Sequence, residues 1–322
     1  MQETFLKTRT IEESLKEPRE ETIRAAILKT MAFFSLYELP VNLSTIHQLL
    51  YKARASFEQV SAEVAKLTSE GRVQAQDGLY ALKSWDEGRI LGNKKEIGKR
   101  WRKVWRYFWV LSLVPFVDQI SVINSLALGN ADHESDIDFF VVTAPGKLYL
   151  VRSIIIAVFR ILGVYKTRQH VNERFCFGFY VSSDHESLED VLVDGEDPLF
   201  AFWFASFAPI LNQKSYLHLV GSNRWINDYF PNFDPGTRLA YIKQSSWLVS
   251  VLKRTLEILL VVPAFLLEPL LRSVHIRHTF NLPENHWPTS TTIANQSMLK
   301  LHALDPRVEI REKFYEALKS LR

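Results

Sequence analysis

The segment that most constrains the fold is Ser-Asp-Ile-Asp-Phe-Phe at residues 135–140, where two acids alternate with apolar residues. Successive side chains of a β-strand point to opposite faces, so Asp136 and Asp138 share one face and Ile137 and Phe139 the other. Two adjacent carboxylates on an apolar strand repel each other and are costly to desolvate. A divalent cation that prefers oxygen ligands, Mg²⁺ or Mn²⁺, offsets this cost. A solvated strand end is the alternative, because Asp-x-Asp is a common motif.

The composition is that of a globular protein with a sizeable core. The chain has 322 residues, which favours two domains or one large domain with an appendage. Hydrophobic residues make up 47% and charged residues 23%, which excludes a disordered or collagen-like chain. The net charge of +3 is too small for the whole surface to attract nucleic acid, although a single segment can still be basic.

The cysteine content and the first residues bear on the cellular compartment. The single cysteine, Cys176, excludes an intramolecular disulfide and a Cys-x-x-Cys zinc site. Residues 1–21 mix charges of both signs and contain no apolar run, so we expect no secretory signal. Both observations predict a cytoplasmic protein.

Residues 247–271 form the most apolar long segment. Four charged residues interrupt it: Lys253, Arg254, Glu257 and Glu268. The uncharged part, residues 258–267, is too short for a bilayer, which needs about 20 apolar residues, so we expect no transmembrane segment. We expect a helix that is buried in the core and bent at Pro263, with an interfacial helix or an oligomer contact as the alternatives.

The first 88 residues have the element order of a small recognition domain. Helical patterns cover residues 22–36, 45–51 and 56–69, and strand patterns cover residues 72–75 and 79–82 around a turn at Asp77-Gly78. This order resembles the winged-helix superfamily and predicts a winged-helix-like domain over residues 1–88. Its third helix carries Glu58 and Glu63 but a single lysine, Lys66, which favours a protein contact or a structural role over DNA binding.

A dense basic run, KKEIGKRWRKVWR at residues 94–106, lies within a predicted linker helix over residues 89–118. A helix places Trp101, Trp105, Phe108 and Trp109 on one side and the cations on the other. A linker helix that packs its tryptophans is one interpretation. Contact with a nucleic acid through residues 94–106 is the other.

The residues before the acidic pair extend the pattern. A strand-like run from residue 119 ends at Asn124-Ser125, and ten residues, 126–135, separate this pair from Asp136-Ile137-Asp138. This arrangement resembles the nucleotidyltransferase fold of the DNA polymerase beta superfamily, in an uncharacterised bacterial branch with an N-terminal winged helix. Asn124 stands where that family usually has glycine, and asparagine tolerates the left-handed backbone that glycine permits.

The resemblance implies an α/β (α+β) fold with a small mixed-sheet core over residues 119–215 and a helical C-terminal region over residues 216–322. It implies that Asp136 and Asp138 are catalytic and hold Mg²⁺ or Mn²⁺. Residues that the resemblance assigns to nucleotide binding are Asn124, Ser125, Ser135 and Lys147. Most active members add a third carboxylate on a later strand; Asp184 is the preferred candidate here and Glu173 the alternative.

The implied activity is Mg²⁺-dependent transfer of a nucleoside monophosphate from a nucleoside triphosphate (NTP) to an unidentified acceptor. A protein hydroxyl, a small molecule and an RNA end all remain open as acceptors. The alternative is a regulator in which a degenerate transferase domain senses nucleotide and the winged helix binds DNA or a protein.

Overall fold

The computed structural model describes residues 20–283, 290–301 and 305–321. The chain divides into two compact units. Unit 1 comprises Met1–Trp85, Ile226–Phe233 and Lys313–Arg322, and unit 2 comprises Asp86–Trp225 and Asp234–Glu312. The predicted mixed α/β class is confirmed, because helices accompany a three-stranded sheet and a six-stranded mixed sheet.

Unit 1 contains the predicted sequence of three helices followed by a hairpin. Its elements are α2 (Glu20–Ser35), β1 (Val41–Asn42), α3 (Leu43–Gln48), α4 (Phe57–Ser69), β2 (Gln74–Gln76), β3 (Leu79–Ala81) and α11 (Ile226–Tyr229). Ser56 and Gln59 start α4 with a reciprocal capping box. Asp77 and Gly78 both have positive φ, as the tight turn of a two-residue hairpin requires.

The core of unit 1 includes side chains from distant parts of the sequence. Phe314, on α13 (Arg307–Lys319), is fully buried and packs edge-on against Phe33 and Tyr51. Asn232 donates hydrogen bonds from its amide to the carbonyls of His47 and Ala55. The first 88 residues therefore share their core with two short later segments, which the linear division of the sequence does not include.

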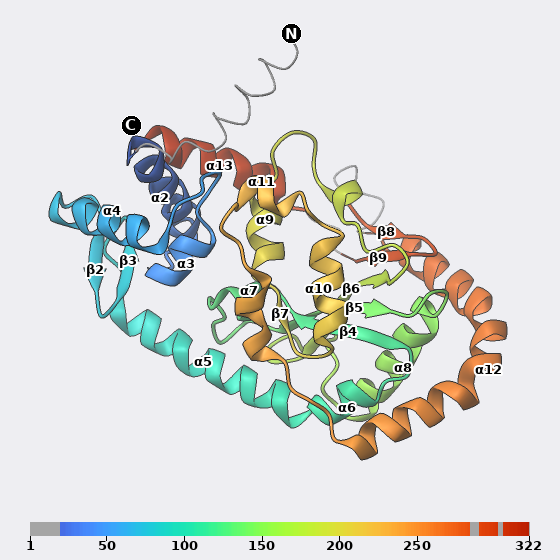
Figure 1. Cartoon of the computed structure of the whole chain (residues 1–322). Helices are drawn as coiled ribbons and strands as arrows, with labels where there is room; N and C mark the ends of the chain where they lie inside the picture. The colour runs from blue at the N-terminus through green and yellow to red at the C-terminus, as the bar shows by residue number, and fades with distance from the viewer. Residues whose placement is uncertain (1–19, 284–289, 302–304, 322) are drawn as a thin grey trace, which may run out of the picture. The chain divides into compact units, whose positions relative to one another are not determined.

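The sheet of unit 2 has the strand order β7-β4-β5-β6-β9-β8 (Figure 1). Its strands are β4 (Val117–Val122), β5 (Ile137–Thr143), β6 (Phe175–Ser182), β7 (Ala208–Pro209), β8 (Ile293–Ala294) and β9 (Met298–Lys300). β4 and β5 are antiparallel, whereas β5 and β6 are parallel. The parallel pair needs a crossover, and α8 (Leu148–Ile161) provides it. The region predicted as helical from residue 216 onward thus also contributes β8 and β9 to the sheet.

Besides α8, unit 2 contains α5 (Glu87–Arg106), α6 (Phe108–Leu113), α7 (Asn124–Leu128), α9 (Pro198–Ala205), α10 (Gln213–Gly221) and α12 (Trp247–Phe280), with short 3₁₀ turns at Glu189–Val191 and Pro235–Tyr241. The predicted linker helix ends at Arg106, so Trp109 lies on α6 and is mostly exposed, whereas Trp101 and Trp105 stack on each other.

The expectation that residues 247–271 are buried in the core is wrong. α12 is a single helix that continues through Pro263 and Pro269, and most of its large apolar side chains are exposed. Two of its charged residues, Glu268 and Lys253, instead face the rest of unit 2, because they bond to backbone groups there. Within the described ranges, none of the helices combines the length and the apolar character needed to cross a bilayer.

Candidate metal and nucleotide site

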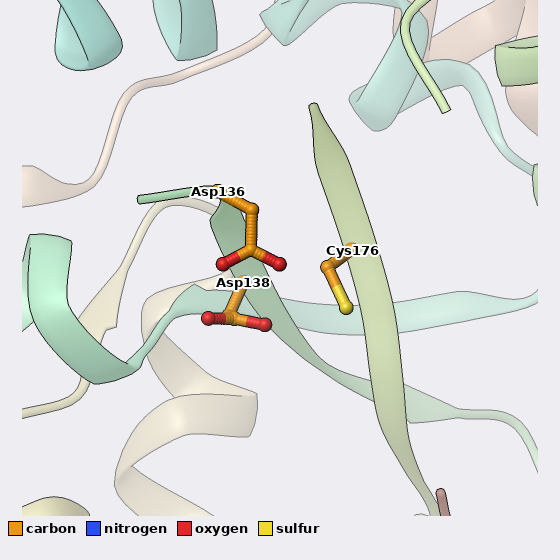
Figure 2. Close-up of side chains that lie close together, drawn as sticks. All are labelled: Asp136, Asp138 and Cys176. Carbon is orange, nitrogen blue, oxygen red and sulfur yellow. The ribbon is translucent and has the colours of Figure 1, made fainter. Parts of the chain in front are cut away.

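Asp136 and Asp138 lie side by side at the start of β5, with Cys176 on the adjacent strand (Figure 2). One ligand atom from each residue lies within 4.8 Å of the others. Figure 2 shows both carboxylates and the sulfur directed toward a common region. The predicted shared face of the two acids is therefore confirmed.

The strand pairing explains why Cys176 joins the two acids. In the parallel register of β5 and β6, Asp138 lies directly opposite Cys176. The next residues, Phe139 and Phe177, project to the other face, where their rings stack with centroids 4.8 Å apart. The apolar face anchors both strands in the core, so the polar face is held in a fixed geometry.

The electrostatic environment disfavours two ionised carboxylates. Burial and the neighbouring Asp136 charge raise the pKa of Asp138 to about 6. Burial also raises the pKa of the Cys176 thiol well above its ordinary value, and the Asp138 charge adds to this effect. The protein alone therefore only partly compensates the negative charge of this site.

Lys166 places a positive charge beside the acidic pair and compensates part of its negative charge. Its Nζ lies 2.5 Å from Oδ2 of Asp136. Burial lowers the pKa of this ammonium, but its interactions with Cys176, Asp136 and Asp138 outweigh that effect and raise it. The lysine follows α8 and is held by a hydrogen bond from its backbone N–H to the Phe175 carbonyl, 2.9 Å long. Sequence reasoning missed Lys166, because only the register of the chain against β6 brings it to the acids.

Asn124 links the start of α7 to the acidic pair. Its φ of 57° is left-handed, which confirms the expected backbone at the position where the resembled family has glycine. Its side-chain amide donates a hydrogen bond to Asp138, which lowers the pKa of that carboxyl. Its Oδ1 accepts from Nε1 of Trp203 at 2.5 Å. Trp203, which the sequence did not single out, therefore fixes the orientation of the asparagine.

Ser125 and Ser135 are near the pair along the chain but differ in their surroundings. Ser125 follows Asn124 in α7 and is half-buried. Ser135 directly precedes Asp136, and its hydroxyl donates to Oδ1 of Asp132 at 2.7 Å. Its carbonyl accepts two hydrogen bonds from the guanidinium of Arg100, at 3.0 and 2.8 Å. The Ser135 hydroxyl thus serves the turn that positions Asp136.

The structure does not bring Lys147 and Asp184 to the acidic pair. Asp138 and Cys176 lie at the beginnings of β5 and β6, whereas Lys147 and Asp184 follow the ends of these strands. The seven residues of β5 separate the two ends by roughly 20 Å. Lys147 lies over the Phe116 ring instead, and Asp184 accepts a hydrogen bond from Ser182.

The backbone of Glu173, the alternative third acid, lies beside Ser135, the residue before Asp136. Its N–H donates to the Ser135 carbonyl at 3.0 Å. Its carboxylate, however, forms an ion pair with Lys99. The position on the next strand that is level with Asp138 is therefore occupied by a cysteine, not by a carboxylate.

The basic run on α5 is partly structural. Arg100 is fully buried, and Lys103 donates to the Glu173 carbonyl at 2.6 Å. The remaining cations are more exposed. Together with Glu173, four of the cations line a hollow of about 390 Å³: Lys99, Arg102, Lys103 and Arg106. One segment therefore both holds the loop before Asp136 and presents positive charge.

The donor set fits a divalent cation that prefers oxygen. Mg²⁺ is commonly bound through one or two carboxylates together with substrate phosphates and waters, so Asp136 and Asp138 suffice as protein ligands. A thiol is a soft ligand and adds little affinity for Mg²⁺. The raised pKa of Asp138 indicates the uncompensated charge that such an ion would neutralise.

Comparison with protein-family models, with curated proteins and with solved structures finds no match to this chain. A functional conclusion therefore depends on the residues and their geometry.

Proposed function

We propose that the protein is a Mg²⁺- or Mn²⁺-dependent nucleotidyltransferase that transfers a nucleoside monophosphate from an NTP to an acceptor. The observation that carries this proposal is the cluster of Asp136, Asp138 and Asn124 at the adjoining ends of β5 and α7. It supports the spacing argument from the sequence, in which the asparagine-serine pair and the two acids act on one nucleotide.

Each residue has a defined task in this proposal. Asp136 and Asp138 hold the metal ion, which neutralises negative charge on the triphosphate when it is bound. Lys166 exchanges its ion pair with Asp136 for a phosphate oxygen. Asn124 orients Asp138 through its amide, and Ser125 and the backbone around it face the phosphates.

The group transfer balances without a further reactant. An acceptor hydroxyl oxygen attacks the α-phosphorus, the bond from that phosphorus to the bridging oxygen breaks, and pyrophosphate leaves with the electron pair. The hydroxyl proton passes to solvent or to a base on the acceptor. Positioning of the triphosphate and stabilisation of its charge account for the acceleration.

The acceptor is a protein hydroxyl, a small molecule or an RNA end. The basic hollow on α5 favours a polyanion among these, because phosphates of a nucleic acid would meet Lys99, Arg102 and Arg106 there. This interpretation keeps residues 94–106 as a nucleic-acid contact in addition to their structural role.

Calorimetric titration tests the proposal. The full chain is titrated with each of the four NTPs, with and without Mg²⁺, and the Asp136→Asn/Asp138→Asn variant is the matched control. We expect Mg²⁺-dependent binding of at least one NTP, with loss of about a hundredfold or more in the variant. Equal binding by both proteins would contradict the assigned site.

A regulator is the second candidate, and two observations favour it. Cys176, and not a carboxylate, lies level with Asp138 on the next strand, and Lys166 already pairs with Asp136. In this case the domain senses nucleotide without turnover, and unit 1 acts as the recognition module; its helix-helix-helix-hairpin order supports the winged-helix prediction. NTP binding without pyrophosphate release, for every acceptor class, would favour this candidate.

A further inference from the structure

α12 exposes large apolar side chains that an ordinary surface helix would bury. Six large apolar side chains are each between 61% and 73% exposed: Ile258, Leu259, Val262, Phe265, Leu266 and Leu270. We call these six residues the apolar face of α12. The buried residues of the same stretch, Ala264 and Glu268, include a carboxylate. An ordinary surface helix buries its apolar stripe and exposes its charges.

Hydrogen bonds fix the rotation of α12 about its axis. The Glu268 carboxylate accepts from the backbone N–H groups of Tyr149 and Leu150, at 2.9 and 2.8 Å, and so caps the first turn of α8. Glu257 accepts from the Phe116 N–H at 3.0 Å. It precedes Glu268 by eleven residues, about three helical turns, so both carboxylates lie on the same side of α12. These bonds require the apolar face to point away from unit 2. Figure 1 shows α12 running alongside α8.

We infer that the apolar face of α12 binds the surface of a membrane that contains anionic phospholipid. Exposed apolar patches of this kind mark contacts with proteins or lipids, and a helix lying in the membrane interface uses such a face. The helix lies in the plane of the interface with the apolar face in the acyl region.

The width of the apolar face favours a bilayer over a second copy of the helix. At about 100° per residue, the exposed positions from Leu259 to Leu270 spread over more than a third of the circumference. Val261 is 50% exposed and Leu267 is 42% exposed, and these two residues widen the apolar face on either side. A single partner helix covers only a narrow seam, whereas a lipid surface covers the whole arc.

The charges at the two ends of the apolar face favour anionic lipid. Arg254 precedes it with its side chain 76% exposed, paired at 3.6 Å with the mostly buried carboxylate of Glu257, and Arg277 follows it on the exposed surface. The two acids of the helix, Glu257 and Glu268, are turned inward. Trp247 is 72% exposed at the start of α12, and tryptophan is enriched at the level of lipid head groups.

Co-sedimentation of the full chain with vesicles tests this inference. The vesicles contain phosphatidylcholine alone or phosphatidylcholine mixed with phosphatidylglycerol. We expect the wild type to sediment with the mixed vesicles and the Phe265→Glu/Leu266→Glu variant to bind at least about tenfold more weakly. Leu91→Glu on α5 is the matched control, because Leu91 is 71% exposed, and it should sediment like the wild type.

Wild-type protein that stays in the supernatant, or a double variant that sediments equally, would overturn the inference. Equal binding to both vesicle types would overturn the role of anionic lipid. Light scattering without vesicles completes the test: a wild-type dimer that the double variant loses, together with no vesicle binding, would assign the face to a second copy. Thermal unfolding followed by circular dichroism confirms that the variants are folded, which is expected because both substituted side chains are exposed.

Discussion

Charged side chains face inward both at the start of β5 and along α12, but they meet different partners there. On α12, Glu268 accepts hydrogen bonds from two backbone N–H groups, which compensate its negative charge within the protein. On β5, Asp136 and Asp138 face each other, and Lys166 is the cation that approaches them. The negative charge at the start of β5 is therefore only partly compensated within the protein, whereas the carboxylate of Glu268 on α12 is satisfied and the apolar face of that helix is exposed.

Removal of the α12 carboxylate should have the largest effect on stability. Glu268→Ala leaves two buried N–H groups at the first turn of α8 without an acceptor, and we expect the free energy of unfolding to fall by about 2–4 kcal/mol. Urea unfolding followed by circular dichroism measures the change. Glu268→Gln, which keeps one acceptor, should lose less; equal losses would contradict the capping role.

Removal of a β5 carboxylate should have the opposite effect and increase the free energy of unfolding. Asp138→Asn eliminates the repulsion from Asp136, so the metal-free variant should be more stable than the wild type by about 1–2 kcal/mol. The same urea titration measures this. A destabilised Asp138→Asn variant would mean that the charge of Asp138 is already compensated within the protein, as that of Glu268 is.

The difference in stability between the wild type and Asp138→Asn should depend on pH. An acid whose pKa is raised on folding holds its proton more tightly in the folded state, so its favourable contribution is complete below the unfolded pKa. That contribution is lost as the pH rises through about 6, the pKa of Asp138 in the folded protein. We expect the stability of the metal-free wild type, relative to Asp138→Asn, to decrease between about pH 4 and 6. A difference that does not change over this window would contradict the raised pKa.

Supplying the missing acid should strengthen metal binding. Cys176 lies level with Asp138, so Cys176→Asp adds a third carboxylate to the cluster, and we expect about tenfold tighter Mg²⁺ binding in the presence of NTP. Calorimetry measures the affinity. Cys176→Ser is the control for loss of the thiol and should leave the Mg²⁺ affinity unchanged. Tighter Mg²⁺ binding by the serine variant would mean that removal of the thiol, and not an added carboxylate ligand, causes the effect.

Substitutions at the other ends of the strands should have the smallest effect. Lys147→Ala and Asp184→Asn change residues that follow the ends of β5 and β6, away from Asp138. We expect NTP affinity within about twofold of the wild type, since charges screened over roughly 20 Å interact weakly. A loss comparable to that of the Asp136→Asn/Asp138→Asn variant would restore both residues to the site.

The sequence predicted what depends on local periodicity and backbone preference. The two-residue period of β5 predicted the shared face of Asp136 and Asp138, and the tolerance of asparagine for positive φ predicted the conformation of Asn124. It did not predict Lys166 or the position of Cys176, because both depend on the pairing register of β6.

The sequence was misleading where tertiary contacts override pattern. Apolar residues of α12 predicted burial, but the hydrogen bonds of Glu257 and Glu268 decide which side of the helix faces inward. Asp184 was predicted because it follows the end of the later strand, and Lys147 because it lies at the start of the helix after β5. Neither position along the chain reveals which end of a strand lies at the acidic pair. Strand direction, not proximity in sequence, determines which residues meet at the site.

Anomalous scattering from crystals of the full chain grown with Mn²⁺ and a non-hydrolysable NTP analogue would locate the metal ion directly. We expect a manganese peak at coordination distance from both Asp136 and Asp138, with the Lys166 ammonium moved from Asp136 toward a phosphate. A nucleotide bound elsewhere, or no peak at this pair while Lys166 remains on Asp136, would contradict it.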